Sequence, residues 1–129
     1  MISCAGLGDW EYELPNGYSI IRLNASTIII GSDYKGYESS IIFERYITSF
    51  AYNEQYVCAR RLDVPENYFF DDIMNMDFEE AEYLIIDTIS HEIHSSLSKE
   101  EYQSLCKELN ITGLCDWIDT YPDPEGAIY

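Results

Sequence analysis

Apolar and polar residues alternate, or form short apolar runs, along the first half of the chain. Trp10-Glu11-Tyr12-Glu13-Leu14 alternates large apolar side chains with acidic ones, which is the period of a strand with one buried face. Residues 27–30 (Thr-Ile-Ile-Ile) are β-branched throughout, which favours an extended backbone. Pro15-Asn16-Gly17 is typical of a turn. Similar patterns predict strands at residues 18–23, 41–43, 47–52, 56–62 and 83–88, with 92–94 as a hairpin partner of the last.

A helical pattern follows at about residues 98–110. Ser98 and Glu101 have the spacing of a capping box, in which each side chain bonds the backbone N–H of the other residue. The apolar residues from Tyr102 to Leu109 recur at i, i+3, i+4 and i+7 and form one stripe. The pattern therefore predicts an amphipathic helix that packs on the strands.

Together these elements predict an α+β fold, an antiparallel β-meander of five to six strands with one C-terminal amphipathic helix. The length suits a single domain over residues 1–129. Residues 116–129 are aromatic, acidic and contain proline, and we expect them to form an irregular acidic tail.

The distribution of charge is most uneven between Arg61 and Lys99. This stretch carries ten acidic residues and no lysine or arginine. An unpaired carboxylate is costly to bury, so most of them must face water, a metal or a basic partner. The formal net charge of −17 disfavours direct binding to nucleic acid or to anionic membranes, whose phosphates require Lys and Arg. It favours a basic protein partner, or it only keeps the protein soluble.

Aromatic residues lie among these carboxylates and would supply the apolar anchors that protein interfaces require. We interpret the block as a partner-binding surface whose carboxylates mimic the phosphates of nucleic acid. The predicted partner-binding residues are Glu66, Tyr68, Phe69, Asp71, Asp72, Asp77, Glu79, Glu80 and Glu82. Two alternatives stay open: a solvated acidic face whose aromatic residues point to the core, and a calcium site within residues 71–80. That stretch lacks the glycine and the spacing of an EF-hand loop.

Catalytic and metal-binding motifs are few. His91-Glu92-Ile93-His94 differs from the HExxH zinc motif, and on a strand the two imidazoles would point to opposite faces. We therefore expect solvated hairpin histidines. The sequence contains no G-x-S-x-G motif and no glycine-rich phosphate loop after a strand. The prediction is a non-catalytic protein with no cofactor and no metal.

The four cysteines do not form a CxxC pair, which disfavours zinc-ribbon and thioredoxin-type sites. Cys58 and Cys106 lie inside apolar patterns, so we expect buried free thiols. A disulfide between Cys106 and Cys115 remains open. Cys4 follows a small residue and upstream aliphatics, as in a bacterial lipoprotein signal, although the preceding apolar stretch is missing. No apolar run approaches the roughly 18 residues of a membrane span.

Three runs carry a resemblance to a known family. They are Tyr12 to Tyr18, Ile47 to Asn53, and the unit from Tyr83-Leu84-Ile85-Ile86-Asp87-Thr88 to Leu97-Ser98-Lys99-Glu100-Glu101-Tyr102. In these runs the chain resembles, over roughly residues 4–111, a family of small bacterial proteins of unknown function that are often secreted or lipid-anchored. The strand-to-helix unit also resembles toxin-immunity and phage-encoded small proteins. The family has no established catalytic residues, so the resemblance implies a fold and a class only.

These observations favour a non-catalytic acidic protein that binds, and inhibits or neutralises, a basic partner, such as a nucleic-acid-binding protein. A phage-encoded inhibitor or an immunity-type protein in the cytoplasm would act in this way. The alternative is a bacterial envelope lipoprotein that is anchored through Cys4.

Overall fold

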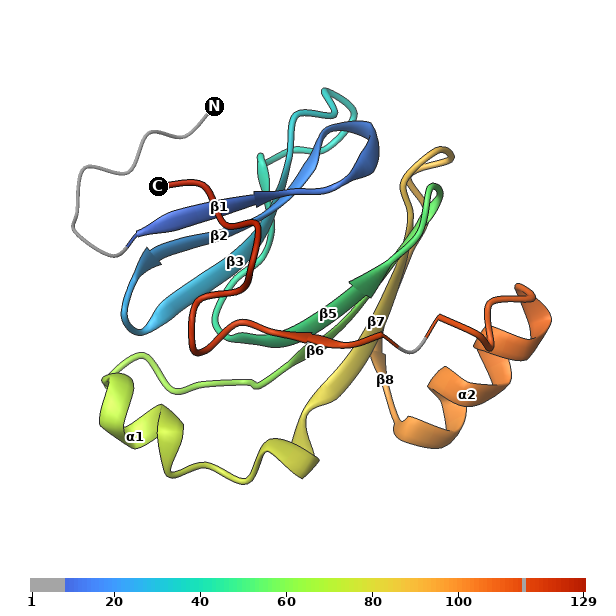
Figure 1. The fold of residues 1–129 in the computed structure, drawn as a ribbon. Helices are drawn as coiled ribbons and strands as arrows, with labels where there is room; N and C mark the ends of the chain where they lie inside the picture. Colours follow the sequence, from blue (N-terminus) through green and yellow to red (C-terminus); the bar gives the residue numbers. More distant parts are fainter. Residues whose placement is uncertain (1–8, 115) are drawn as a thin grey trace.

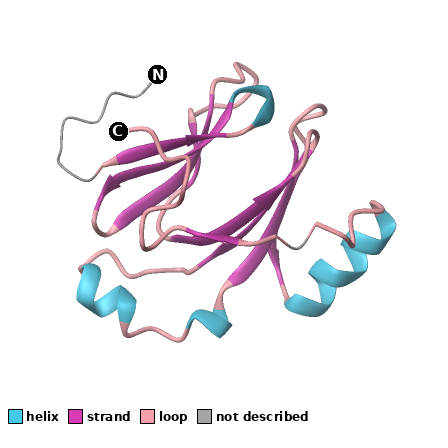
Figure 2. Ribbon diagram, viewed as in Figure 1, coloured by secondary structure: helices cyan, strands magenta, loops and turns pink. Residues whose placement is uncertain are grey.

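The computed structural model describes residues 9–114 and 116–129. Two antiparallel β-sheets pack against each other, and a helix covers the outer face of the second sheet (Figure 1). Strands and loops make up most of the molecule, with short helical turns in the connections (Figure 2).

The first sheet is built by the N-terminal part of the chain in the strand order β1-β2-β3-β4. Consecutive strands are neighbours, and a short 3-10 helix η1 (Pro15–Gly17) makes the first turn. Asn16 and Gly17 both have positive φ there, which this tight turn requires. The four strands are β1 (Trp10–Glu13), β2 (Tyr18–Asn24), β3 (Thr27–Ser32) and β4 (Ile41–Phe43).

The second sheet has the strand order β8-β7-β6-β5-β9. Between β6 and β7 the chain forms the short helix α1 (Phe70–Met74) and the 3-10 helix η2 (Phe78–Glu80). The helix α2 (Lys99–Glu108) follows β8. The five strands are β5 (Ile47–Tyr52), β6 (Tyr56–Arg61), β7 (Glu82–Asp87), β8 (Ile93–Leu97) and β9 (Ile118–Asp119).

The main core lies between the two sheets. Trp10, Ile20 and Ile30 of the first sheet meet Phe50 and Ile86 of the second, and each of these side chains is at most 1% exposed. Alternate residues of each strand point into this layer, because successive side chains of a strand face opposite sides. Burial of these apolar side chains is the dominant favourable contribution to folding.

A smaller core forms on the other face of the second sheet. Cys58 and Ile85 point outward from β6 and β7 and contact Tyr102 and Cys106 of α2. The predicted helix is confirmed, and its apolar stripe faces the sheet. Its capping box is also present: the Ser98 hydroxyl accepts from the N–H of Glu101 at 3.1 Å.

Replacing Ser98 by alanine should reduce the free energy of unfolding by about 1 kcal/mol, because the first turn of α2 loses its cap. Chemical denaturation measures this loss. Ser104→Ala is the matched control, since Ser104 is exposed in the middle of the same helix, where alanine is well tolerated. Equal stability of the two variants would contradict a stabilising role for the cap.

The C-terminal residues return to both sheets. The short strand β9 pairs with β5, and Ile128 forms a bridge with Glu11 of β1. The indole Nε1 of Trp10 also donates to the Asp123 carboxylate at 3.1 Å. Residues 116–129, expected to be irregular, are mostly loop, but they contain β9 and are fastened to the sheets at these points.

The predicted α+β class holds in outline, and its details need correction. The described residues form nine strands in two sheets, whereas the sequence predicts one meander of five to six strands. The helix is not C-terminal, since β9 follows it. Two sheets form because the strands carry more apolar side chains than one sheet with one helix would bury. Ile28, Ile29 and Ile30, for example, are all at most 1% exposed.

Candidate functional site

The acidic segment, residues 62–81, leaves and re-enters the second sheet at one point. Arg61, the last residue of β6, pairs directly with Glu82, the first residue of β7. A tight hairpin would join two such strands with a few residues. The chain instead makes a long excursion that contains α1 and η2 and passes along one end of the two sheets (Figure 1).

The inner side of the acidic segment is fixed to the main core. Ile73 is fully buried, and Tyr68, Met74 and Met76 pack against the same core. The Arg45 guanidinium donates to the backbone carbonyls of the segment, including that of Glu66 at 3.1 Å. The segment is therefore an ordered part of the fold.

Two of its carboxylates stabilise local structure. Asp72 accepts from the N–H of Phe69 at 2.9 Å at the start of α1. Asp77 accepts from the N–H of Glu79 at 3.0 Å at the start of η2. Ionised carboxylates at these positions also interact favourably with the N–H groups of a first helical turn. The acidic sequence of this region thus has a structural cause in addition to any recognition role.

The outer side of the acidic segment presents charge and aromatic surface together. Phe69 is 75% exposed and Phe78 is 40% exposed, although both are large apolar residues. The predicted partner-binding carboxylates that are exposed in the same segment are Glu66, Asp71, Asp72, Asp77, Glu79 and Glu80. We call these eight residues the acidic surface.

Two predicted partner-binding residues lie differently. Tyr68 is half-buried against the core, so its ring is largely unavailable as an anchor. Glu82 is half-buried at the start of β7, and its carboxylate lies 3.9 Å from the Arg61 guanidinium. A pair at this distance on the surface contributes little to stability.

The histidines differ from the solvated hairpin residues that the sequence predicts. The ring of His91 stacks on that of Tyr34, with centroids 3.6 Å apart. Its Nδ1 lies 2.7 Å from the Tyr18 hydroxyl, and the Tyr37 hydroxyl donates to its backbone carbonyl at 2.9 Å. His91 therefore joins the β7–β8 turn to the first sheet. His94 is half-buried, and its Nε2 lies 3.2 Å from a carboxylate oxygen of Glu92.

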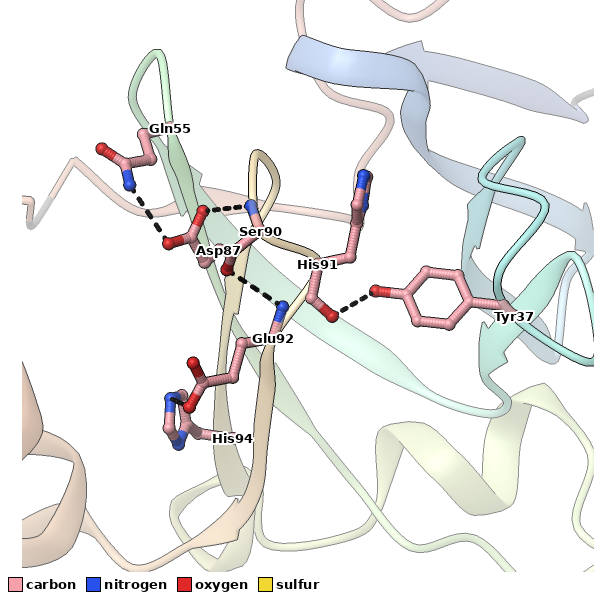
Figure 3. Close-up of polar contacts among 7 residues, drawn as sticks. All are labelled: Tyr37, Gln55, Asp87, Ser90, His91, Glu92 and His94. Atoms are coloured by element: carbon pink, nitrogen blue, oxygen red, sulfur yellow. Dashed lines mark hydrogen bonds and ion pairs between the residues drawn. The ribbon is translucent and has the colours of Figure 1, made fainter.

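Asp87 organises the same turn (Figure 3). Burial disfavours its ionised form, but hydrogen bonds from the N–H groups of Ser90 and Ile89 and from the Gln55 amide outweigh this effect. The net result is a lowered pKa of the Asp87 carboxyl group. The carboxylate stabilises a turn in which His91 has positive φ. The sequence does not reveal these contacts of His91, because Tyr18, Tyr34 and Tyr37 are far from it in the chain.

The thiols of Cys58 and Cys106 are buried and free, as the sequence predicts. Burial raises the pKa of the Cys58 thiol to about 12, so it stays protonated at neutral pH. Cys4 and Cys115 lie outside the described residues, so the lipid-anchor hypothesis stays a prediction. The free thiol of Cys106 does not support its disulfide with Cys115.

Within residues 9–114 and 116–129, no group of three or more His, Cys, Asp or Glu side chains is arranged to hold a metal ion. In the same residues, no helix is long and apolar enough to cross a membrane. The acidic surface combines exposed carboxylates with the exposed rings of Phe69 and Phe78, and it is the candidate site for binding.

Fold and surface together define a small two-sheet α+β protein with one ordered acidic excursion. The profile of a family described as "Protein of unknown function (DUF3997)" matches residues 15–120, and the chain belongs to that family. A family of unknown function is what the sequence resemblance implied; bacterial origin and secretion stay predictions. Neither a search of curated proteins nor one of solved structures found a match.

Proposed function

We propose that this protein is a non-catalytic binding protein that engages a basic partner protein through the acidic surface. The partner would be inhibited or neutralised, as by a phage-encoded inhibitor or an immunity-type protein. The carboxylates would occupy the places of nucleic-acid phosphates if the partner is a nucleic-acid-binding protein.

The observation that carries this proposal is the exposure of Phe69 among carboxylates on an ordered backbone. The ring of Phe69 is 75% exposed, in a segment whose other exposed residues are mostly acidic. Aromatic side chains, phenylalanine among them, are enriched at protein interfaces, where a polar rim surrounds a more apolar centre. The buried Ile73 holds the neighbouring turn of α1 in place, so little ordering would be lost on binding.

The negative charge of the acidic surface indicates a partner with a basic surface. Carboxylates on one surface, in a chain of formal net charge −17, attract Lys and Arg side chains over long range. Such attraction raises the association rate and is screened by salt, with a Debye length of about 8 Å at physiological ionic strength. The apolar contact of Phe69 would instead control the dissociation rate.

The triple variant Glu66→Gln, Asp71→Asn and Glu80→Gln should weaken partner binding at least about tenfold and make it less sensitive to salt. These carboxylates are exposed, so the fold should keep its stability. The measurement is capture from a lysate of the source organism, followed by association and dissociation rates of the captured protein at two salt concentrations.

Glu100→Gln, Glu108→Gln and Glu125→Gln form the matched control, because all three are exposed, lie outside the acidic segment and remove the same charge. The control should retain binding. Phe69→Ala should raise the dissociation rate and leave the association rate nearly unchanged. Equal binding by the two triple variants would reject the acidic surface as the binding site and leave it as a means of solubility.

A further inference from the structure

A cavity of about 260 Å³ lies where the acidic segment meets β5, β6 and the C-terminal segment, residues 116–129. Its inner part is formed by buried residues that include Tyr46, Thr48 and Thr120. Phe78 and Tyr121, both partly exposed, lie nearer the surface. The volume is slightly below that of most sites for drug-sized ligands, so an occupant would be small.

Arg60 supplies a fixed positive charge to this cavity. Its Nε donates to the Ser49 hydroxyl at 2.6 Å, and its guanidinium carbon lies 4.3 Å from the centre of the Trp117 ring. Among the described residues, no carboxylate lies within 4.0 Å of this guanidinium. Hydrogen bonds to those residues use only Nε, so both terminal nitrogens keep their donors.

Negative charge lies in the same cavity. Glu79 of η2 and Asp119 of β9 both line it, and both are exposed to solvent. The cavity thus contains one guanidinium and two carboxylates that do not pair directly with it. Apolar surface from Met74, Phe78 and Tyr121 completes the lining.

We propose that this cavity binds a small zwitterion, an apolar α-amino acid. Its carboxylate would take the terminal N–H groups of Arg60, whose planar fork suits a carboxylate. Its ammonium group would face Glu79 and Asp119, and its side chain would contact the aromatic and methionine lining. A ligand with a carboxylate alone would be repelled by the negative field of the protein, and the ammonium group offsets that repulsion.

This inference is independent of the proposed partner binding, although Phe78 and Glu79 belong to both surfaces. The triple variant that tests the acidic surface changes no residue that lines the cavity. Either proposal can therefore fail without the other.

The test uses the full chain with L-phenylalanine, L-leucine and L-methionine as probes in isothermal titration calorimetry. At least one should bind, and its N-acetyl and amide derivatives, which lack the ammonium or the carboxylate, should each bind about tenfold more weakly or worse. Arg60→Gln should cause a similar loss. The affinity of Arg60→Lys should lie between those of the wild type and Arg60→Gln, because lysine keeps the charge but lacks the planar fork of N–H donors.

Arg61→Gln is the control, since the neighbouring arginine does not line the cavity and instead donates to the Glu44 carbonyl at 2.8 Å. It should bind like the wild type. No binding of any probe at about 10 mM, where even a weak millimolar complex would form, overturns the proposal. So does an amide derivative that binds the wild type as tightly as the free amino acid, a result that does not depend on the folding of any variant.

Discussion

Replacing Phe50 by alanine should lower the free energy of unfolding by about 3–5 kcal/mol, the range for removal of a buried phenylalanine. Phe50 is fully buried at the centre of the main core. Its ring lies 4.9 Å from that of Tyr12, so it joins the second sheet to the first. A cavity at this position would remove contacts from both sheets. Urea denaturation measures the loss.

Phe69→Ala is the matched control for Phe50→Ala, because it makes the same change at a ring that is 75% exposed. Its effect on stability should be within about 0.5 kcal/mol, as for ordinary surface substitutions. If the two variants lost equal stability, Phe50 would not be the core residue that the structure describes, or Phe69 would not be exposed.

Ile73→Ala should destabilise the protein by about 2–5 kcal/mol and also weaken partner binding. Ile73 is fully buried and fixes α1 to the main core. Without it, the acidic segment would lose its fixed backbone and would have to be ordered again on binding. Urea denaturation gives the first effect, and amide hydrogen exchange within residues 62–81 reports the loosening of the segment.

Ile89→Ala is the control for Ile73→Ala, since Ile89 is 63% exposed in the β7–β8 turn. Its stability and its partner binding should match those of the wild type. Unchanged exchange rates in the acidic segment of Ile73→Ala would mean that the core does not hold the segment.

Much of the local structure could be predicted because it depends on neighbouring residues. Alternation or β-branching identified β1 and β3, and the capping box identified the start of α2 within one residue. Strand β9 has only two residues, too few to show any period. The division into two sheets also escaped prediction, because it depends on contacts between residues far apart in the chain.

The candidate site was predicted only in part, because some of its features are local in the sequence and others depend on the fold. A gap in basic residues and a run of carboxylates are visible in the sequence, and the structure places most of the chosen carboxylates on the surface. The pattern does not reveal that Tyr68 packs inward while Phe69 points out, since no clean period runs through residues 66–81. Arg60 and Trp117 are far apart in sequence, and only the fold brings them together.

The C-terminal segment has a consequence for how copies of this protein meet in solution. A β-strand at the edge of a sheet offers unpaired N–H and C=O groups, which invite pairing with another chain. Here β9 covers part of the free side of β5, and the Ile128 bridge covers part of the free side of β1. One stretch of chain, residues 118–128, therefore shields part of an edge of each sheet from edge-to-edge pairing with another copy.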